Sequence, residues 1–262
     1  MILVFGGTGF VGSFVSSRLS SVDEVVLAVR RPGRSEFRQV SFSSPNEIPG
    51  LIAGLNPDVV INFIGVLRGD YSTAHVEIPK LISLGAEEIN ARLIHTSALG
   101  ADENSEIPYF RTKALGEKAV RKVKSHAIVR PSLVLGAGQR IFRQALRFRV
   151  FPKVTGRVQP IDLRDLAELY LRLIDSKNGT FNACGEEVVP LGELLDNVLK
   201  RAGKRVFLVP FPKAIARALG KVDKSLLMAL KDSVCAHNHA REILRNLRPL
   251  EESLLWTAEG LR

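Results

Sequence analysis

The sequence begins MILVFGGTGFVGS, in which Gly6, Gly9 and Gly12 stand directly between an apolar run and a helical pattern. The first glycine permits a tight turn after a strand, and the second lets the backbone approach a ligand closely. The third allows the following helix to pack tightly on the strand. Because the first N–H groups of a helix lack internal partners, its N-terminus can hold phosphate oxygens. This spacing therefore predicts a strand, a tight turn and a helix that bind the pyrophosphate of a dinucleotide.

Short runs rich in β-branched residues alternate with helical stretches through the first half of the sequence. The expected strands are 1–5, 24–29, 38–42, 58–64, 92–97 and 126–130. The expected helices are about 10–20, 45–54, 72–89 and 109–124. This alternation is typical of βαβ units, whose parallel strands form a sheet with helices on both faces.

After Pro131 the rhythm changes to mostly helical segments with loops, and further extended pieces are expected at 180–184 and 205–212. The predicted fold class is α/β: a Rossmann-type doubly wound parallel sheet of about seven strands with a small C-terminal helical substrate lobe. We assign residues 1–135 to the dinucleotide-binding Rossmann core. Residues 136–262 form an interwoven C-terminal part that contributes a late strand and the small lobe.

The composition is that of an ordinary globular protein, with 45% apolar and 24% charged residues among 262. No apolar run approaches the roughly 20 residues that cross a bilayer. The sequence also enters its first strand without the basic region and cleavage site of a signal peptide. Cys184 and Cys235 lie far apart without metal-ligand spacing, so we expect neither a disulfide framework nor a metal site. These features predict a cytoplasmic protein in a reducing compartment, with no membrane span.

The formal charge of +10 is concentrated in the second half of the sequence. Residues 200–262 hold thirteen Lys or Arg and six Asp or Glu, a net of +7. A second basic group without any acid consists of Arg140, Arg143, Arg147, Arg149, Lys153 and Arg157. Over 140–153 the pattern fits an amphipathic helix, which either packs on the core or contacts an anionic substrate, an acidic partner or a membrane surface. Because 200–262 lacks interleaved aromatic residues for base stacking, we expect no specific nucleic-acid binding.

The end of the second expected strand indicates which dinucleotide is preferred. Folds that prefer NAD usually carry Asp or Glu there to bind the ribose 2′-hydroxyl. In this sequence the position is Arg30, eighteen residues after Gly12, and Arg31 follows. Two guanidinium groups can pair with a 2′-phosphate, although two solvated arginines in a turn before Pro32 would look the same. We therefore expect NADP in preference to NAD.

Tyr109 stands four residues before Lys113 in PYFRTKALGEK, so both side chains share one face of the expected helix. Taken alone, the pair could be two ordinary residues on a helix surface. Together with GGTGFVG, HTSALGA, RPSLVLGAG and QPIDLRDLA it resembles the short-chain dehydrogenase/reductase superfamily, over about residues 1–212. The similarity is to the extended and atypical branch, the NAD(P)-dependent epimerase/dehydratase type. It is most similar to the group that includes the nucleotide-binding accessory subunit of respiratory complex I.

The resemblance implies a role for each matching residue. Tyr109 would be the general acid/base, and Lys113 would bind the nicotinamide ribose and lower the pKa of the tyrosine. Ser97 is the nearest candidate for the third catalytic residue and Thr96 the second, because extended enzymes often use the position that is Ala98 here. The implied dinucleotide contacts are Gly6, Gly7, Thr8, Gly9, Phe10, Val11, Gly12, Arg30, Arg31, Phe63, Ile64, Gly65, Tyr109, Lys113, Pro131 and Ser132.

Other polar residues are weaker candidates for a site. His237 and His239 lie two apart, so on a helix they would not face each other and would not form a metal site. His75 is expected at the start of the helix after the fourth strand, near the cofactor and without a catalytic partner. Asp162 and Asp165 are expected to cap and stabilise the start of a helix.

Three classes of function are consistent with these observations. The first is an NADP-dependent oxidoreductase or epimerase/dehydratase-like enzyme acting on an alcohol or carbonyl centre of a small, possibly anionic substrate, as Tyr109 and Lys113 favour. The second is a non-catalytic NADPH-binding redox sensor or assembly protein, which Ala98 and the short loop before Tyr109 favour. The third is an RNA-binding relative, which only the basic 200–262 stretch favours. We expect the first, and an oligomer is compatible with any of them.

Overall fold

The structure is a computed structural model, which describes residues 1–139, 141–142, 145–146, 150–153, 156–205, 207–210, 227–228 and 230–261. The arginines that define the expected helix over 140–153 lie outside the described residues: Arg140, Arg143, Arg147 and Arg149. The chain forms two compact units. The sheet unit comprises Met1–Arg130 and Ala167–Phe181, and the C-terminal unit comprises Pro131–Leu166 and Asn182–Arg262.

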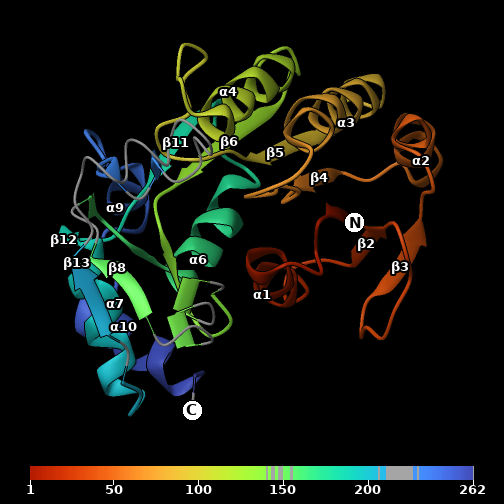
Figure 1. Ribbon diagram of the computed structural model, residues 1–262. Coiled ribbons are helices and arrows are strands. Elements are labelled where there is room, and N and C mark those ends of the chain that lie inside the picture. Colours follow the sequence, from red (N-terminus) through yellow and green to blue (C-terminus); the bar gives the residue numbers. More distant parts are fainter. Residues whose placement is uncertain are drawn as a thin grey trace. The chain divides into compact units, whose positions relative to one another are not determined.

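One seven-stranded sheet forms the centre of the sheet unit (Figure 1). Its strands are β1 (Ile2–Phe5), β2 (Val25–Val29), β3 (Arg38–Ser41), β4 (Val59–Asn62), β5 (Arg92–Thr96), β6 (His126–Pro131) and β11 (Gly179–Ala183). Their spatial order is β11-β6-β5-β4-β1-β2-β3, and every neighbouring pair from β3 to β6 is parallel. Because the order reverses between β1 and β4, this is the doubly wound arrangement. The predicted fold class and the late strand at 180–184 are confirmed.

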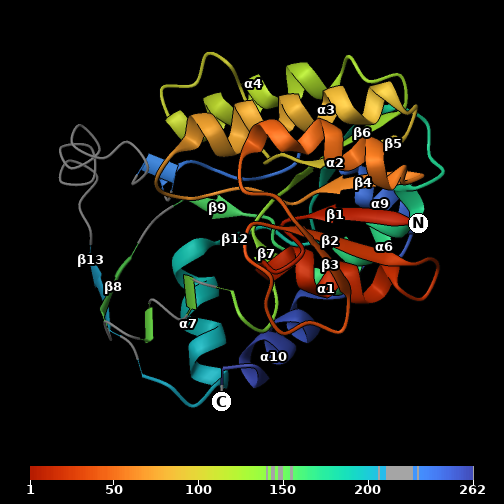
Figure 2. The same cartoon turned by 90° about the vertical axis from the view of Figure 1, so that its right-hand side faces the viewer.

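Helices cover both faces of this sheet. They are α1 (Phe10–Leu19), α2 (Ile48–Leu55), α3 (Ile78–Glu88), α4 (Pro108–Val120) and α6 (Leu163–Leu173), with a short 3₁₀ turn η1 (Pro45–Glu47) before α2. Figure 2 shows α2, α3 and α4 on one face and α1 and α6 on the other. On the first face Leu3, Phe5 and Leu93 join Ile52 and Ile82 in one buried cluster. Since both faces are covered, the strands are apolar throughout instead of alternating with polar residues.

The helix expected over 72–89 begins with a π turn, η2 (Thr73–Glu77), which runs directly into α3. Pro79 has no N–H, so the carbonyl of His75 lacks the donor that an α-helix would place four residues later. Gly116 of α4 packs against that carbonyl, because a Cβ at Gly116 would stand 2.0 Å from the His75 oxygen. The wider turn therefore coincides with a close approach of α4 to η2.

The described residues of the C-terminal unit form short paired strands and helices. The strand pairs are β7 (Val134–Leu135) with β10 (Ile161–Asp162), β9 (Arg157–Val158) with β12 (Val189–Pro190), and β8 (Val150–Lys153) with β13 (Phe207–Pro210). The helices that lie wholly in this unit are α7 (Leu191–Arg201), α9 (His239–Leu244) and α10 (Leu250–Glu259). Leu195 and Val198 of α7 share a buried cluster with Leu254 and Ala258 of α10. Among the described helices of the whole chain, none has the length and apolarity needed to cross a bilayer.

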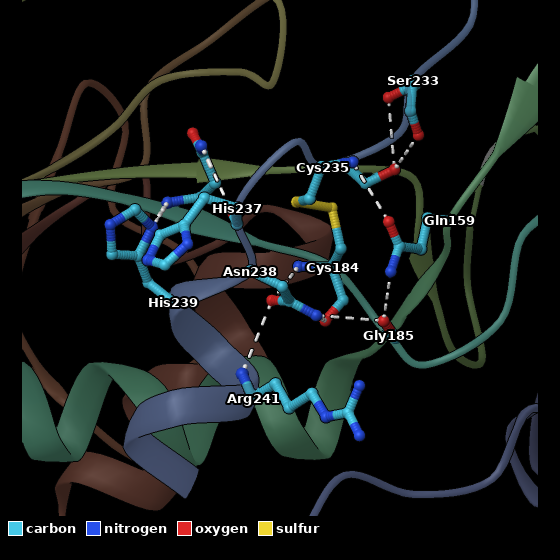
Figure 3. The surroundings of a disulfide bond; sticks show 11 residues. Gln159, Cys184, Gly185, Ser233, Cys235, His237, Asn238, His239 and Arg241 are labelled. Carbon is cyan, nitrogen blue, oxygen red and sulfur yellow. Dashed lines mark hydrogen bonds between the residues drawn. A yellow bond between two sulfur atoms is a disulfide. The ribbon is translucent and has the colours of Figure 1, made fainter. Parts of the chain in front are cut away.

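A disulfide joins Cys184, at the end of β11, to Cys235 (Figure 3). We call residues 231–239 the strap, because hydrogen bonds fasten this segment to neighbouring backbone. The N–H of Ser233 donates to the carbonyl of Arg157 at 2.8 Å, and the N–H of Cys235 donates to Gln159 Oε1 at 3.0 Å. The prediction of unpaired cysteines is wrong, because only the tertiary fold brings two positions 51 residues apart within a Cα–Cα distance of 6.3 Å. The inference of a reducing compartment from unpaired cysteines therefore loses its basis.

Removing this disulfide should destabilise the folded protein. Closing a loop of 51 residues restricts the unfolded chain, which typically stabilises the folded state by about 2–4 kcal/mol. We expect Cys235→Ser to lower the free energy of unfolding in urea by about that amount. As a control, alkylation of the denatured, unreduced parent protein should label neither cysteine. Labelling of both would contradict the bond.

Candidate functional site

The glycine turn after β1 is shaped by backbone contacts that exclude side chains. Gly6 has φ +75°, and a Cβ there would stand 2.9 Å from the backbone N of Ile64. A Cβ on Gly12 would stand 2.2 Å from the carbonyl oxygen of Gly6. Gly6 therefore needs its positive φ and its bare Cα, and Gly12 lets α1 begin directly against the turn.

The N-terminus of α1 is suited to an anion. Gly9 is its N-cap, no side chain caps the helix, and no acidic residue lies in the first turn. The N–H groups of Phe10, Val11 and Gly12 have no acceptor within the helix, and the helix dipole adds positive potential there. Gly9 leaves the approach open, because the nearest atom to a Cβ at that position is the Gly6 oxygen at 3.3 Å. These residues fit a pyrophosphate, as the spacing predicts.

Arg30 and Arg31 follow β2 and are exposed. Neither forms an ion pair with any acidic residue in the described part of the chain. Two exposed guanidinium groups at this strand end could bind a phosphate. Their preference for a 2′-phosphate remains a prediction.

The loop after β4 connects the glycine turn to α4. Its residues Phe63 and Ile64 lie against Gly6, as the 2.9 Å distances from a Cβ at Gly6 show. The next residue, Gly65, faces α4, because a Cβ there would stand 3.0 Å from Lys113 Nζ. Asn62, the last residue of β4, fixes the start of the loop, because its side-chain oxygen accepts the Ile64 N–H at 2.9 Å. The three predicted loop residues thus lie between the other two predicted parts of the site.

Lys113 is buried in the middle of α4. Its ammonium donates to the carbonyl oxygen of Thr96, at the end of β5, at 2.9 Å. Burial lowers the pKa of Lys113 to about 8, and the negative charge of Glu117 opposes that shift. The side chain is therefore still charged at neutral pH. Because its pKa is close to neutral pH, a change in its surroundings can remove the proton from the ammonium.

Tyr109 lies half-buried in the first turn of α4, within a group of aromatic rings. Its ring is 5.4 Å from His75, 5.4 Å from Phe110 and 6.3 Å from Tyr71 between centroids, each pair packing edge to face. Burial raises the pKa of Tyr109 to about 12, and Tyr71 adds to the rise. The expected lowering of this pKa by Lys113 stays a prediction, since burial and Tyr71 are the causes that act on the phenol here. Loss of water around the phenol outweighs any effect of the ammonium, which is directed to the Thr96 carbonyl.

Ser97 is buried and its hydroxyl donates to Glu117 Oε1 at 2.5 Å. Glu117 also accepts from Arg130, at 2.7 Å to Nε, and from Arg121, at 2.5 Å to Nη2. The hydroxyl therefore belongs to a buried charged cluster one turn beyond Lys113. The second candidate, Thr96, shares a hydrogen bond of 2.6 Å with the hydroxyl of Tyr170 on α6. Both candidate hydroxyls thus already have partners within the sheet unit.

His75 is more closely connected to this site than the sequence indicates. It lies in η2 with its ring between Tyr71 and Tyr109, and both ring nitrogens are hydrogen-bonded. The sequence does hold a signal for it. Tyr71 precedes His75 by four residues, the same offset as Tyr109 and Lys113, so an aromatic and a basic side chain share a helix face twice.

The remaining predicted residues belong to the C-terminal unit. Ser132 donates its N–H to the carbonyl of Ala183 at 2.9 Å and its hydroxyl to the carbonyl of Ser233 in the strap at 3.0 Å. Asp162 accepts the N–H of Arg164 at 2.7 Å at the start of α6, as expected for a helix cap. Within the described residues no group of three His, Cys, Asp or Glu could hold a metal ion.

Gly12→Ala should disrupt the glycine turn, because its Cβ would overlap the Gly6 oxygen. We expect the free energy of unfolding to fall by about 1–3 kcal/mol and dinucleotide binding to be lost in calorimetry. Gly54→Ala in α2 is the control, since nothing lies within 4 Å of its Cβ position. That change should stabilise the helix by about 0.5–1 kcal/mol. Equal stability of the two variants would contradict the close contact at Gly12.

Known proteins share both the sequence pattern and the fold. The NADH-ubiquinone oxidoreductase 40 kDa subunit, mitochondrial, of Neurospora crassa is 26% identical over 253 residues, which are 85% of this chain and 66% of that protein. The NADH dehydrogenase [ubiquinone] 1 alpha subcomplex subunit 9, mitochondrial, of Mus musculus is 31% identical over 168 residues, 56% of this chain and 44% of that protein. The chain therefore spans between 44% and 66% of the length of these relatives.

Solved structures with low identity share the fold. MoeE5 in complex with UDP-glucuronic acid and NAD superposes with a TM-score of 0.80 at 17% identity, covering 100% of this chain and 98% of that one. A dTDP-4-dehydrorhamnose reductase from Bacillus anthracis in complex with NADP has a TM-score of 0.72 at 16% identity, with coverage of 98% and 96%. The model of the NAD dependent epimerase/dehydratase family matches residues 2–184, well over half of the sequence. The chain belongs to the NAD dependent epimerase/dehydratase family.

Proposed function

We propose that the sheet unit binds NADP(H) and that Tyr109 exchanges a proton with the carbonyl or alcohol group of a small substrate. The observation that carries this proposal is the continuity of the loop after β4. Phe63 and Ile64 lie against the glycine turn, and a Cβ on Gly65 would stand 3.0 Å from the ammonium of Lys113. Turn, loop and α4 therefore form one connected surface, which the family uses for a dinucleotide.

Each residue of this surface has a separate task in the proposal. The start of α1 binds the pyrophosphate through backbone N–H groups, and Lys113 directs its ammonium to the nicotinamide ribose. A nicotinamide dinucleotide, when bound, supplies or accepts the hydride. Tyr109, with a pKa of about 12, is a protonated phenol at neutral pH and is suited to donate a proton to a carbonyl oxygen. In this protonated form the phenol would donate its proton when a carbonyl group is reduced.

A second candidate function is non-catalytic binding of NADPH by a redox sensor or an assembly protein. The hydroxyl of Ser97 is held by Glu117, which leaves Tyr109 without the serine partner that family enzymes use. The relatives of Neurospora crassa and Mus musculus are named as mitochondrial subunits of an NADH-ubiquinone oxidoreductase and of an NADH dehydrogenase [ubiquinone]. Under this reading the chain contacts protein partners, and Tyr109 forms part of the wall of the dinucleotide site.

The preference for NADP(H) can be tested through the two arginines after β2. Changing both Arg30 and Arg31 to Ala should weaken NADPH binding by about 10- to 100-fold. Each substitution removes one charge-assisted contact to the 2′-phosphate, and the contacts lie at an exposed site. NADH binding should barely change in the same calorimetric titrations. Arg34→Ala, another exposed arginine of this loop, is the matched control. Equal affinity of the parent protein for NADPH and NADH would end this part of the proposal.

Catalysis can be separated from binding at Tyr109. Tyr109→Phe removes the proton donor and keeps the ring, so folding and NADPH affinity should persist while turnover falls by about 10²–10⁴-fold. Tyr71→Phe is the control, because the Tyr71 hydroxyl donates to the carbonyl of Leu67. Aldehydes, ketones and sugar nucleotides are first screened for NADPH consumption by the parent protein. Full activity of Tyr109→Phe would exclude its catalytic role, and a silent screen with intact NADPH binding would favour the second candidate.

A further inference from the structure

His75 hydrogen-bonds two different parts of the candidate site at once. Its Nε2 accepts the backbone N–H of Val66, in the loop after β4, at 3.0 Å. Its Nδ1 lies 2.9 Å from Thr112 Oγ1 on α4, one residue before Lys113. One buried ring therefore spans the distance between the loop and the helix that carries Tyr109 and Lys113.

The two partners determine where the ring carries its proton. An N–H donor such as that of Val66 requires an unprotonated Nε2, so the proton of the neutral ring is on Nδ1. The hydroxyl of Thr112 donates its own proton to the carbonyl of Pro108 at 2.8 Å, and therefore accepts from Nδ1–H. With both nitrogens occupied, the ring cannot serve as an acid or base without breaking one of these hydrogen bonds.

The surroundings fix the ring in place. It stacks on Tyr71 at a centroid distance of 5.3 Å and meets the edge of Tyr109 at 5.4 Å. Its backbone carbonyl is pressed against Gly116, where a Cβ would stand only 2.0 Å away. The π turn at η2 thus presents both the carbonyl and the side chain of His75 to α4. Such turns occur frequently at functional sites.

Two hydrogen bonds hold the loop on either side of Gly65. Asn62 accepts the N–H of Ile64, and His75 accepts the N–H of Val66, so the two bonds flank Gly65 on either side. Gly65 is the residue whose Cβ position lies 3.0 Å from Lys113 Nζ and 3.7 Å from His75 Nε2. Losing the bond to Val66 would therefore free the half of the loop that faces Lys113.

We propose that His75 is a positioning residue, a neutral bracket that holds the loop 63–66 against α4 so that Gly65, Lys113 and Tyr109 keep one arrangement for the dinucleotide. This inference rests on the proposed binding of the dinucleotide at that loop. His75 itself needs no contact with substrate or cofactor.

Burial and the positive charge of Lys113 together keep His75 neutral. Burial lowers its pKa to about 3, and the positive charge of Lys113 contributes further. The other titratable groups near the ring are Tyr109 on α4, Tyr71 before η2 and His95 on β5. Since the pKa is depressed from 6.5, stability from the bracket is fully present above about pH 6.5 and is lost as pH falls toward 3. The bracket therefore does not switch within the physiological range.

Three substitutions separate the two arms of the bracket. The amide oxygen of His75→Gln can take the place of Nε2 and keep the bond to Val66. The amide of His75→Asn can take the place of Nδ1 and keep the bond to Thr112. His75→Phe keeps the ring and loses both bonds. Hydrogen exchange of the peptide that contains Val66, followed by mass spectrometry, measures the loop arm without any cofactor, and calorimetry with NADPH measures binding.

We expect His75→Phe and His75→Asn to speed exchange at Val66. His75→Asn should weaken NADPH binding by about tenfold, the effect of one lost buried hydrogen bond, and His75→Phe, which loses both bonds, should weaken it further. His75→Gln should restore slow exchange at Val66 but leave NADPH binding weakened, because its bond to Thr112 is still lost. Slow exchange at Val66 in His75→Phe, or unchanged NADPH affinity despite fast exchange, would overturn the proposal. If the parent protein binds no dinucleotide, the proposed function fails, whereas the exchange measurements still test the bracket.

A second pair of variants covers the case in which His75→Phe does not fold. Thr112→Val keeps the shape of the side chain and removes the acceptor for Nδ1–H, while Thr112→Ser keeps a hydroxyl. We expect Thr112→Val to weaken NADPH binding about tenfold and Thr112→Ser to leave it close to the parent value. Equal affinities of the two variants would also overturn the proposal. In ¹⁵N spectra of the parent protein, His75 should keep its Nδ1–H form between pH 8 and 5.

Discussion

The candidate site depends on the close packing of the loop after β4 between the glycine turn and α4. The backbone of Phe63 and Ile64 lies where a Cβ of Gly6 would be, and the bare Cα of Gly65 lies beside the ammonium of Lys113. No side chain fits at Gly6, and one at Gly65 would displace the ammonium. The positions of the glycine turn and of α4 are therefore coupled through one short piece of backbone. Any change that moves this loop therefore alters both the glycine turn and the surroundings of Lys113.

Two buried side chains of opposite charge, Lys113 and Glu117, lie one turn apart on α4. Lys113 keeps its ammonium on the Thr96 carbonyl, and the nearby histidines, His75 and His95, stay neutral because burial and that positive charge both lower their pKa values. One turn later Glu117 is fully buried, and it is matched by Arg130, Arg121 and the hydroxyl of Ser97. A buried carboxylate of this kind must be paired, since an isolated buried charge is very costly. The pairing stabilises the helix and at the same time takes up the serine that catalysis would require.

Much of the fold follows from local patterns that the sequence displays. The βαβ rhythm predicts seven strands, the late strand at 180–184 and helices close to their observed bounds, because apolar runs and glycine turns act locally. The π turn at η2 differs, since it arises from Pro79 together with the approach of Gly116 from another helix. The disulfide differs for the same reason: Cys184 and Cys235 meet only after the strap has packed beside β9.

By itself the sequence determined the fold class, the family and the glycine turn after β1, because glycine spacing and strand–helix alternation leave a readable pattern along the chain. It also placed Tyr109 and Lys113 on one helix face, since a period of 3.6 residues per turn is a local property. Tertiary structure decided what each side chain touches. It directed Ser97 to Glu117, raised the pKa of Tyr109 and gave His75 its two partners. Those outcomes depend on contacts between residues 9 to 37 positions apart, which form only when β4, β5 and α4 pack together.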